Sequence, residues 1–216
     1  MTRDASSWPT RRHADVQTGD ALRRIARTAA EPSIELLREG LIARIPELAA
    51  LGSVPQDPRW HPEGDVLTHS LLAVDAAARL WDARPGPNDR REIVVLAALF
   101  HDIGKPATTR SDAASVTSHG HAEVGGEIVF EVGGRLGWPA REVGAVVALV
   151  RHHMAHVSVQ GDPTRRAVGR LGRRLTEAGT SLDEWSLVVS ADGAARGSGS
   201  VVSRAEPWLR VASDMR

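Results

Sequence analysis

The chain has 216 residues, 42% of them hydrophobic, and its 27 basic and 27 acidic side chains give a formal net charge of zero. This length fits one domain with a substantial core and excludes two ordinary domains. The neutral charge excludes a general attraction to polyanions or acidic membranes, so any recognition of phosphate must be local. The lack of cysteine excludes disulfides, thiolate zinc sites and cysteine nucleophiles, which leaves His, Asp and Glu as metal ligands.

The sequence also lacks the features expected of a membrane or secreted protein. No stretch approaches the roughly 20 apolar residues of a membrane-spanning helix. Residues 1–17 carry charges and contain no apolar segment of the signal-peptide type. We therefore expect a soluble cytoplasmic protein that makes no membrane contact.

Helical spacing of apolar residues recurs along most of the chain, and the pattern predicts no strand and no internal repeat. Residues 1–17 show no periodicity and are expected to form a flexible tail. Proline, glycine and capping residues separate the helices, which are predicted at residues 21–30, 32–43, 66–82, 89–102, 120–136, 139–153, 162–178 and 181–195. The sequence therefore predicts an all-α fold.

The most informative segment is the apolar run 93–100, which ends in the pair His101–Asp102. A run of this length without a charge indicates a buried helix or strand. An imidazole and a carboxylate at its end are costly to desolvate unless a cation compensates them, and a metal ion is the simplest such cation. Lys105, the only lysine of the chain, follows three residues later.

Further candidate ligands lie on the apolar faces or at the ends of other predicted helices. His69 and Asp192 continue apolar stripes, and His121 opens a helix. His152 and His153 both end a helix, and periodicity does not choose between them; we prefer His152. Taken singly, each histidine is more often a hydrogen-bonded core residue than a ligand. Together, and without cysteine, these residues suit one or two divalent metals with mixed nitrogen and oxygen ligands.

These residues occur within ordered motifs that resemble the HD metal-dependent phosphohydrolase superfamily, named after a His-Asp doublet. The residues that carry the resemblance are His69, His101–Asp102 with Gly104–Lys105, His121, His152–His153 and Asp192. A closer likeness is to the HD domain of bacterial CCA-adding tRNA nucleotidyltransferases, through residues 32–33, 45–48, 54–56, 60–66, 69, 99–105, 120–123 and 191–192. No part of the chain resembles the nucleotidyltransferase head, and its Asp-x-Asp motif is absent.

The resemblance implies a fold and a division of the chain. It implies an all-α, HD-domain helical bundle with a metal site in its core, freestanding from a nucleotidyltransferase. We expect residues 18–58 to form N-terminal helices that pack on this core, and residues 59–197 to form the phosphohydrolase domain. Residues 198–216 are expected to be a C-terminal extension.

The resemblance also implies a set of metal ligands. One divalent ion would be held by His69, His101, Asp102 and Asp192. Asp102 would bridge to a second ion, which His121 and either His152 or His153 would hold. Mn, Fe, Co, Ni, Mg and Zn all remain open as the metal, and the number of ions is one or two.

Catalytic roles follow for Asp102 and three other residues. Lys105 would contact the phosphoryl oxygens as a compact point charge. His61 and Glu63 would support the metal ligands or contact the substrate, where either could donate a proton to the leaving group. Trp60 is the one indole that could serve as a base-stacking platform.

The implied activity is release of phosphate from a small phosphorylated substrate, and we expect a nucleotide phosphomonoesterase or a 2′,3′-cyclic phosphodiesterase. A mixed-valent di-iron oxygenase is one alternative, and a noncatalytic module that binds tRNA or another RNA is a second. The basic residues Arg165, Arg166 and Arg170 could gather substrate phosphates or RNA backbone. The neutral net charge argues against RNA.

Overall fold

A computed structural model describes residues 8, 12–84, 88–112, 115–159, 161–197 and 203–215, with the backbone only for residues 88 and 89. Of the predicted tail, residues 1–7 and 9–11 lie outside the described residues. The rest of it differs from the expectation, because helix α1 already begins at His13 and includes residues 13–17. Part of the predicted C-terminal extension, residues 198–202 and 216, also lies outside the described residues.

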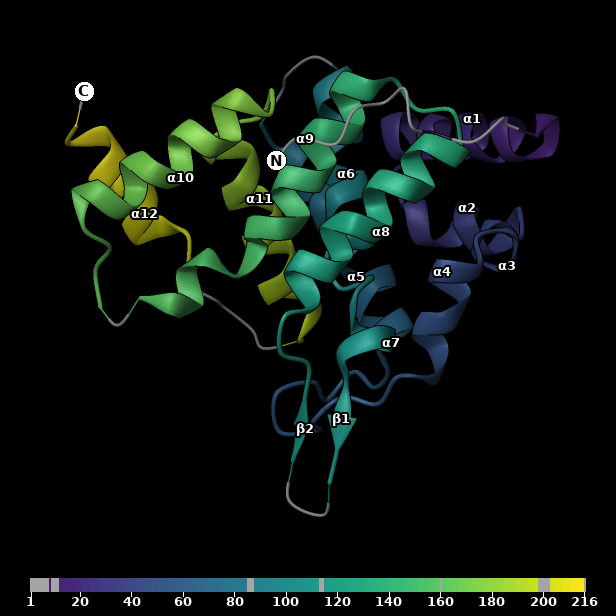
Figure 1. Cartoon of the computed structure of the whole chain (residues 1–216), viewed down its shortest axis with the longest axis horizontal. Coiled ribbons are helices and arrows are strands. Elements are labelled where there is room, and N and C mark those ends of the chain that lie inside the picture. The colour runs from purple at the N-terminus through teal and green to yellow at the C-terminus, as the bar shows by residue number, and fades with distance from the viewer. Residues whose placement is uncertain are drawn as a thin grey trace.

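The apolar run that ends in His101–Asp102 forms the centre of the fold. It belongs to helix α6 (Asn88–Phe100), and every residue from Ile93 to Phe100 is buried. Helix α6 is surrounded because α5 (Val66–Asp82), α1 (His13–Thr28), α9 (Ala140–His152) and α11 (Leu182–Ala195) all pack against it. Figure 1 shows this helix behind α8 and α9, in the middle of the molecule.

The remaining helices cover this centre in two groups. The N-terminal group consists of α1, α2 (Pro32–Arg38), α3 (Leu41–Arg44), α4 (Pro46–Ala49) and the 3-10 helix η2 (Ala50–Ser53). The other group consists of α8 (His121–Arg135), α9, the 3-10 helix η3 (His153–Ser158), α10 (Arg165–Glu177), α11 and α12 (Glu206–Ser213). In Figure 1 the N-terminal group lies at one end of the long axis and α10 and α12 lie at the other, and α8 pairs with α9 in the middle.

Local sequence signals explain where several helices begin. Asp65 caps α5, because its side chain accepts a hydrogen bond from the backbone N–H of Thr68 at 2.7 Å. Ser181 and Glu184 form the predicted capping box of α11, in which each side chain bonds the other's backbone N–H. Both caps fix the start of a helix that carries a candidate ligand.

A short hairpin departs from the expectation that the chain contains no strand. After helix α7 (Lys105–Thr108), strands β1 (Arg110–Ser111) and β2 (Val116–Thr117) pair antiparallel. Thr109 and Ser118 share a hydroxyl–hydroxyl hydrogen bond of 2.7 Å at its base. Two-residue strands are too short to give an alternating pattern, so the sequence offered no signal for them.

The fold class is otherwise as predicted: the described residues form helices, apart from this hairpin and the loops. No helix among them is long and apolar enough to cross a membrane.

Candidate metal centre

Candidate ligands from five separate segments meet beside the central helix. His69 lies in the second turn of α5, and Asp192 lies in the last turn of α11. His101 and Asp102 occupy the turn that follows α6, and His121 is the first residue of α8. His153 is the first residue of η3, directly after α9. The side chains that meet, which we call the ligand cluster, are His69, His101, Asp102, His121, His153 and Asp192.

Each imidazole of the ligand cluster is oriented by a hydrogen bond at its Nδ1 atom. His69 Nδ1 lies 2.6 Å from Glu63 Oε1. The other three lie 2.7–2.8 Å from main-chain carbonyl oxygens, in the pairs His101–Ala98, His121–Ser118 and His153–Val150. Because these oxygens only accept, each Nδ1 must donate its proton. In the neutral imidazole this leaves a lone pair on Nε2, the usual state of a metal-binding histidine.

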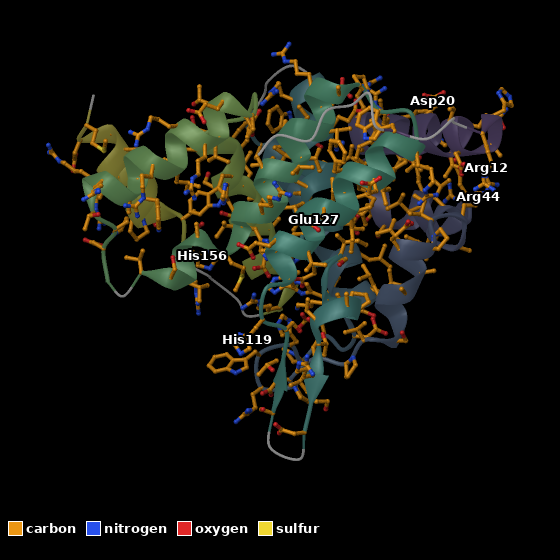
Figure 2. The ribbon with its side chains drawn as sticks, in the orientation of Figure 1. Arg12, Asp20, Arg44, His119, Glu127 and His156 are labelled. Atoms are coloured by element: carbon orange, nitrogen blue, oxygen red, sulfur yellow. The ribbon has the colours of Figure 1, made fainter. Side chains whose placement is uncertain are left out.

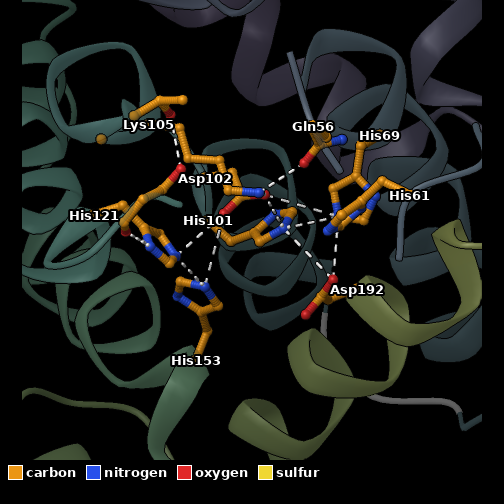
Figure 3. A network of polar contacts seen from close by, with 12 residues as sticks. Gln56, His61, His69, His101, Asp102, Lys105, His121, His153 and Asp192 are labelled. Atoms are coloured by element: carbon orange, nitrogen blue, oxygen red, sulfur yellow. Dashed lines mark hydrogen bonds and ion pairs between the residues drawn. The ribbon is translucent and has the colours of Figure 1, made fainter. Parts of the chain in front are cut away.

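The Nε2 atoms form two groups, one at each oxygen of Asp102 (Figure 3). In the first half-site, His69 Nε2 lies 3.2 Å from His101 Nε2 and 3.1 Å from Asp192 Oδ1. Asp102 Oδ2 joins this group, 3.3 Å from His101 Nε2.

The second half-site lies around the other oxygen of the same carboxylate. His121 Nε2 lies 3.3 Å from Asp102 Oδ1 and 3.2 Å from His153 Nε2. His153 Nε2 lies 3.9 Å from the same oxygen. Asp102 therefore contributes one oxygen to each half-site, which is the arrangement of a bridging carboxylate.

Burial and charge both favour a cation at these positions. All side chains of the ligand cluster are buried, and His69 is 0% exposed. Burial lowers the pKa of His69, but hydrogen bonds to Asp192 and Glu63 outweigh it and raise that pKa to about 9. Burial would raise the pKa of Asp102, yet neighbouring His101 and Lys105 hold it well below its usual range. Carboxylates that stabilise an extra proton at Nε2 stabilise a metal ion there in the same way.

The donor set therefore fits divalent metal. Two neutral imidazoles whose Nε2 atoms face each other at 3.2 Å, each with its proton at Nδ1, bring two lone pairs together unless a proton or a metal ion lies between them. A cation that accepts both lone pairs removes this conflict. Nitrogen and carboxylate ligands without sulfur suit borderline and hard divalent ions.

A glycine allows the two half-sites to approach. Gly104 lies against the start of α8, where an added Cβ would meet the carbonyl oxygen of His121 at 2.1 Å and the nitrogen of Gly125 at 2.7 Å. Any larger residue would move the turn at 101–105 away from α8. The Gly104 of the motif is therefore a packing requirement that keeps Asp102 close to His121.

The comparison of the chain with known families agrees with this geometry. The sequence profile of the HD domain family matches residues 66–184, which is more than half of the chain. The chain belongs to the HD domain family. The matched range contains His69, the His101–Asp102 doublet, His121 and His153.

The curated relatives of this chain have names that refer to CCA or to a tRNA nucleotidyltransferase. The chain is 39% identical over 147 residues to the multifunctional CCA protein of Halorhodospira halophila, covering 64% of this chain and 33% of that protein. It is 38% identical over 139 residues to the CC-adding tRNA nucleotidyltransferase of Thermus thermophilus, covering 61% and 29%. It thus spans about a third of the length of these relatives, and the predicted likeness to the HD domain of CCA-adding enzymes is confirmed.

The preference for His152 over His153 needs correction. The His152 side chain is not part of the ligand cluster, and its main-chain carbonyl accepts a 2.7 Å hydrogen bond from Trp185 Nε1. The helix changes from α to 3-10 geometry at His153. A helical period of 3.6 residues cannot say which of two neighbours points inward across such a change.

Glu63 and Lys105 both contact the ligand cluster and have partners within the chain. Glu63 Oε1 accepts hydrogen bonds from both His61 Nδ1, at 2.9 Å, and His69 Nδ1. Its burial opposes ionisation, but these hydrogen bonds lower the pKa of Glu63 to about 2. Lys105 Nζ lies 2.7 Å from Asp102 Oδ2 and 2.7 Å from Gln56 Oε1. Glu63 therefore orients His69, and Lys105 holds the bridging carboxylate.

Two hollows reach the HD domain's ligand cluster from the surface. The larger, which we call the main pocket, has a volume of about 570 Å³ and is lined by His61, Lys105 and His121 among others. His119 and His156 also line it, and Figure 2 shows both on the side of the molecule that carries the hairpin. The smaller hollow, of about 310 Å³, reaches Asp192.

The arginines of α10 that were expected to gather phosphates lie away from both hollows. Among the described residues, those that line the two hollows do not include Arg165, Arg166 or Arg170. The side chain of Arg165 instead bonds the carbonyl of Asp214, at 3.2 Å, because α10 packs against α12.

Arg196 and Arg204 line both hollows, and the sequence analysis missed them. Arg196 Nη2 contacts both carboxylate oxygens of Asp192, at 2.8 and 3.1 Å. The available signal was the spacing of four residues between Asp192 and Arg196, the residue that follows the last turn of α11.

Proposed function

We propose that this chain is a metal-dependent phosphohydrolase that releases phosphate from a small nucleotide, as a phosphomonoesterase or a 2′,3′-cyclic phosphodiesterase. The observation that carries the proposal is the position of Asp102, with one oxygen in each half-site. This arrangement suits a pair of divalent ions that share a carboxylate. His69, His101, Asp102 and Asp192 would hold one ion, and Asp102, His121 and His153 would hold the other.

The chemistry expected of such a centre is well suited to phosphate esters. Two divalent ions supply an activated water near neutral pH and offset the charge that develops on the phosphoryl oxygens. Other residues of the chain position the ligands: Glu63 fixes the tautomer of His69, and Lys105, bonded to Gln56, orients the carboxylate of Asp102.

His61 is the best placed group for proton transfer to the leaving group. It lines the main pocket, and its Nδ1 is held by Glu63 at 2.9 Å. Burial lowers the pKa of His61, although the hydrogen bond to Glu63 opposes this effect. An imidazole held at Nδ1 presents Nε2 to the pocket, where this nitrogen can take up a proton and pass it to the leaving group.

The main pocket favours a nucleotide over a simpler phosphate ester. Trp60 lines it and is 64% exposed, which is unusual for an indole on a protein without a partner at that surface. Val116, Met154 and Val157 line the same pocket and add apolar surface. A base stacked on Trp60 would bury this surface and gain about 1–3 kcal/mol.

RNA is the alternative that the relatives suggest, since one of them is named a tRNA nucleotidyltransferase and another a CCA protein. A nucleotide at an RNA end presents the same phosphate chemistry. We favour a small nucleotide because the basic helix α10 does not line the main pocket and the net charge is zero.

One preparation can test the proposal. Metal analysis of the protein, with a screen of nucleoside monophosphates and 2′,3′-cyclic nucleotides in Mn²⁺, Co²⁺, Ni²⁺ or Mg²⁺, should give phosphate release or ring opening that His101→Ala abolishes. His13→Ala is the matched control, because His13 lies on α1 and bonds only Gln17 among the described side chains. Iron-rich protein that consumes O₂ and leaves every phosphoester intact would replace this proposal with the oxygenase.

A further inference from the structure

The smaller hollow beside Asp192 has an unusual concentration of positive charge. Its charged lining consists of Arg59, Arg196, Arg204 and the single carboxylate of Asp192. Ser190 and Ser203 add hydroxyl groups, and their Oγ atoms lie 2.6 Å apart. We call this hollow the arginine hollow.

The acidic residues near the arginine hollow do not neutralise it. Arg59 is paired with Asp57, and Arg196 is paired with Asp192. Arg204 is exposed, and no carboxylate of the described residues forms an ion pair with it. Burial is the main cause of the lowered pKa of His156, and the nearby positive charge of Arg204 lowers this pKa further.

A second observation concerns Arg196. Its Nε atom is buried and finds no hydrogen-bond acceptor among the described residues. A buried donor without an acceptor is costly, and in native proteins it commonly marks the place of an unseen partner. The guanidinium groups of Arg196 and Arg204 line the same hollow and favour an oxyanion as that partner.

The arginine hollow and the main pocket form one continuous binding region. Trp60, His156, Arg196 and Arg204 line both of them. The ligand cluster is reached from the main pocket at His121 and from the arginine hollow at Asp192. A molecule whose base lies on Trp60 can therefore extend toward the ligand cluster and toward the arginine hollow at once.

We propose that the arginine hollow binds a second phosphate group of the substrate, one that is not cleaved. The substrate class is then a nucleotide with two separate phosphates, one on each side of the ribose, such as a nucleoside 3′,5′-bisphosphate. The group in the arginine hollow anchors the molecule through Arg204 and Arg196, while the other reaches the ligand cluster. This inference rests on the proposed phosphohydrolase function for its kinetic consequence, but the anion site itself does not depend on that function.

The kinetic test compares substrates that differ by one phosphate. Nucleoside 3′-monophosphates and 3′,5′-bisphosphates are compared for each of the four common bases. We expect kcat/KM for the bisphosphate to exceed that for the monophosphate by about tenfold or more, because the second phosphate adds a charged hydrogen-bonding group. Arg204→Ala should remove most of that ratio. Arg210→Ala, a change to an exposed arginine on α12 that lines neither hollow and pairs with Asp162, should keep it.

A binding measurement separates the anion site from the reaction. Calorimetry with nucleoside 5′-monophosphates on metal-free protein should detect binding that Arg204→Ala weakens about tenfold and Arg210→Ala does not. If this binding is found but no substrate is hydrolysed, the anion site in the arginine hollow is supported and the proposed phosphohydrolase function is wrong. Hydrolysis with equal kcat/KM for both substrates, and no 5′-monophosphate binding, would overturn the inference and leave the function standing.

RNA is the outcome that would reassign the hollow. If a short RNA with a 3′-phosphate is hydrolysed with a kcat/KM about tenfold above that of the bisphosphate, the second phosphate belongs to an RNA backbone. That result would overturn the assignment to a small nucleotide.

Discussion

The two half-sites of the ligand cluster are built from different supports. In the first, Asp192 adds a second carboxylate, and Glu63 holds the Nδ1 of His69. In the second, Asp102 is the only carboxylate, and main-chain carbonyls hold both imidazoles. The first half-site is also the deeper one, because its His69 is 0% exposed whereas His121 of the second is 8% exposed.

This difference predicts two unequal metal affinities. A carboxylate at the far nitrogen makes a histidine a stronger ligand than a carbonyl does, and a second ligating carboxylate adds charge. The first half-site should therefore fill before the second and lose its ion later. The second half-site, nearer the main pocket, should exchange its ion more readily.

Asp102→Ala should have the largest effect because it removes a ligand from both half-sites. We expect the loss of both ions and a fall in kcat/KM of about a thousandfold or more. Metal analysis and the phosphate assay on the same sample measure the two effects. An Asp102→Ala protein that still holds two ions would show that the carboxylate does not bridge.

His121→Ala should distinguish the half-sites. It removes a ligand from the second half-site alone, so the protein should keep one tightly bound ion and lose the weaker one. The expected loss of kcat/KM is about a hundredfold, smaller than for Asp102→Ala. A calorimetric titration of the variant with the metal ion should show one binding phase in place of two. Loss of both phases would mean that the two half-sites do not bind their ions independently.

Glu63→Gln should act on the first half-site only. The amide keeps the shape of the side chain but removes the charge that supports His69, and such changes weaken metal affinity about 10- to 100-fold. The tighter phase of the titration should weaken while the weaker phase stays in place. Asp65→Asn is a suitable control, because it alters a nearby carboxylate that caps α5 and does not touch the ligand cluster.

Gly104→Ala should have the smallest effect and should fall on the second half-site. The added Cβ would collide with the backbone of His121, so the turn must move and the overpacking should cost about 1–3 kcal/mol of stability. We expect a lower Tm and a weaker second metal phase. Gly172→Ala is the control, since an added Cβ there meets nothing within 4 Å; an equal Tm for the two variants would contradict the role of Gly104.

The sequence predicted most of the helices and most of the ligand cluster because both leave strong patterns. Asp192 stood out as a carboxylate on an apolar stripe, and the His101–Asp102 doublet stood out at the end of a buried run. The predicted bounds of α5, residues 66–82, agree with the structure. Such signals are local, so they survive without knowledge of tertiary contacts.

The errors arise where position depends on tertiary packing. The choice between His152 and His153 was decided by a change of helix type that no period reveals. The arginines of α10 were expected near the substrate because amphipathicity predicts only which face of a helix is exposed to solvent. It does not predict which other elements lie near that face. Arg204 lies outside every predicted helix, and only the fold brings it to the hollow that Asp192 lines.

The placement of Asp102 and Asp192 in one buried cluster links cation loading to ligand binding. Both carboxylates keep a pKa well below the usual range, and before cations arrive the side chains of Lys105 and Arg196 balance their charge. Divalent cations bound there would add positive charge to the cavity floor. The affinity of an anionic ligand for this floor should consequently rise with free cation concentration until the cavity is saturated.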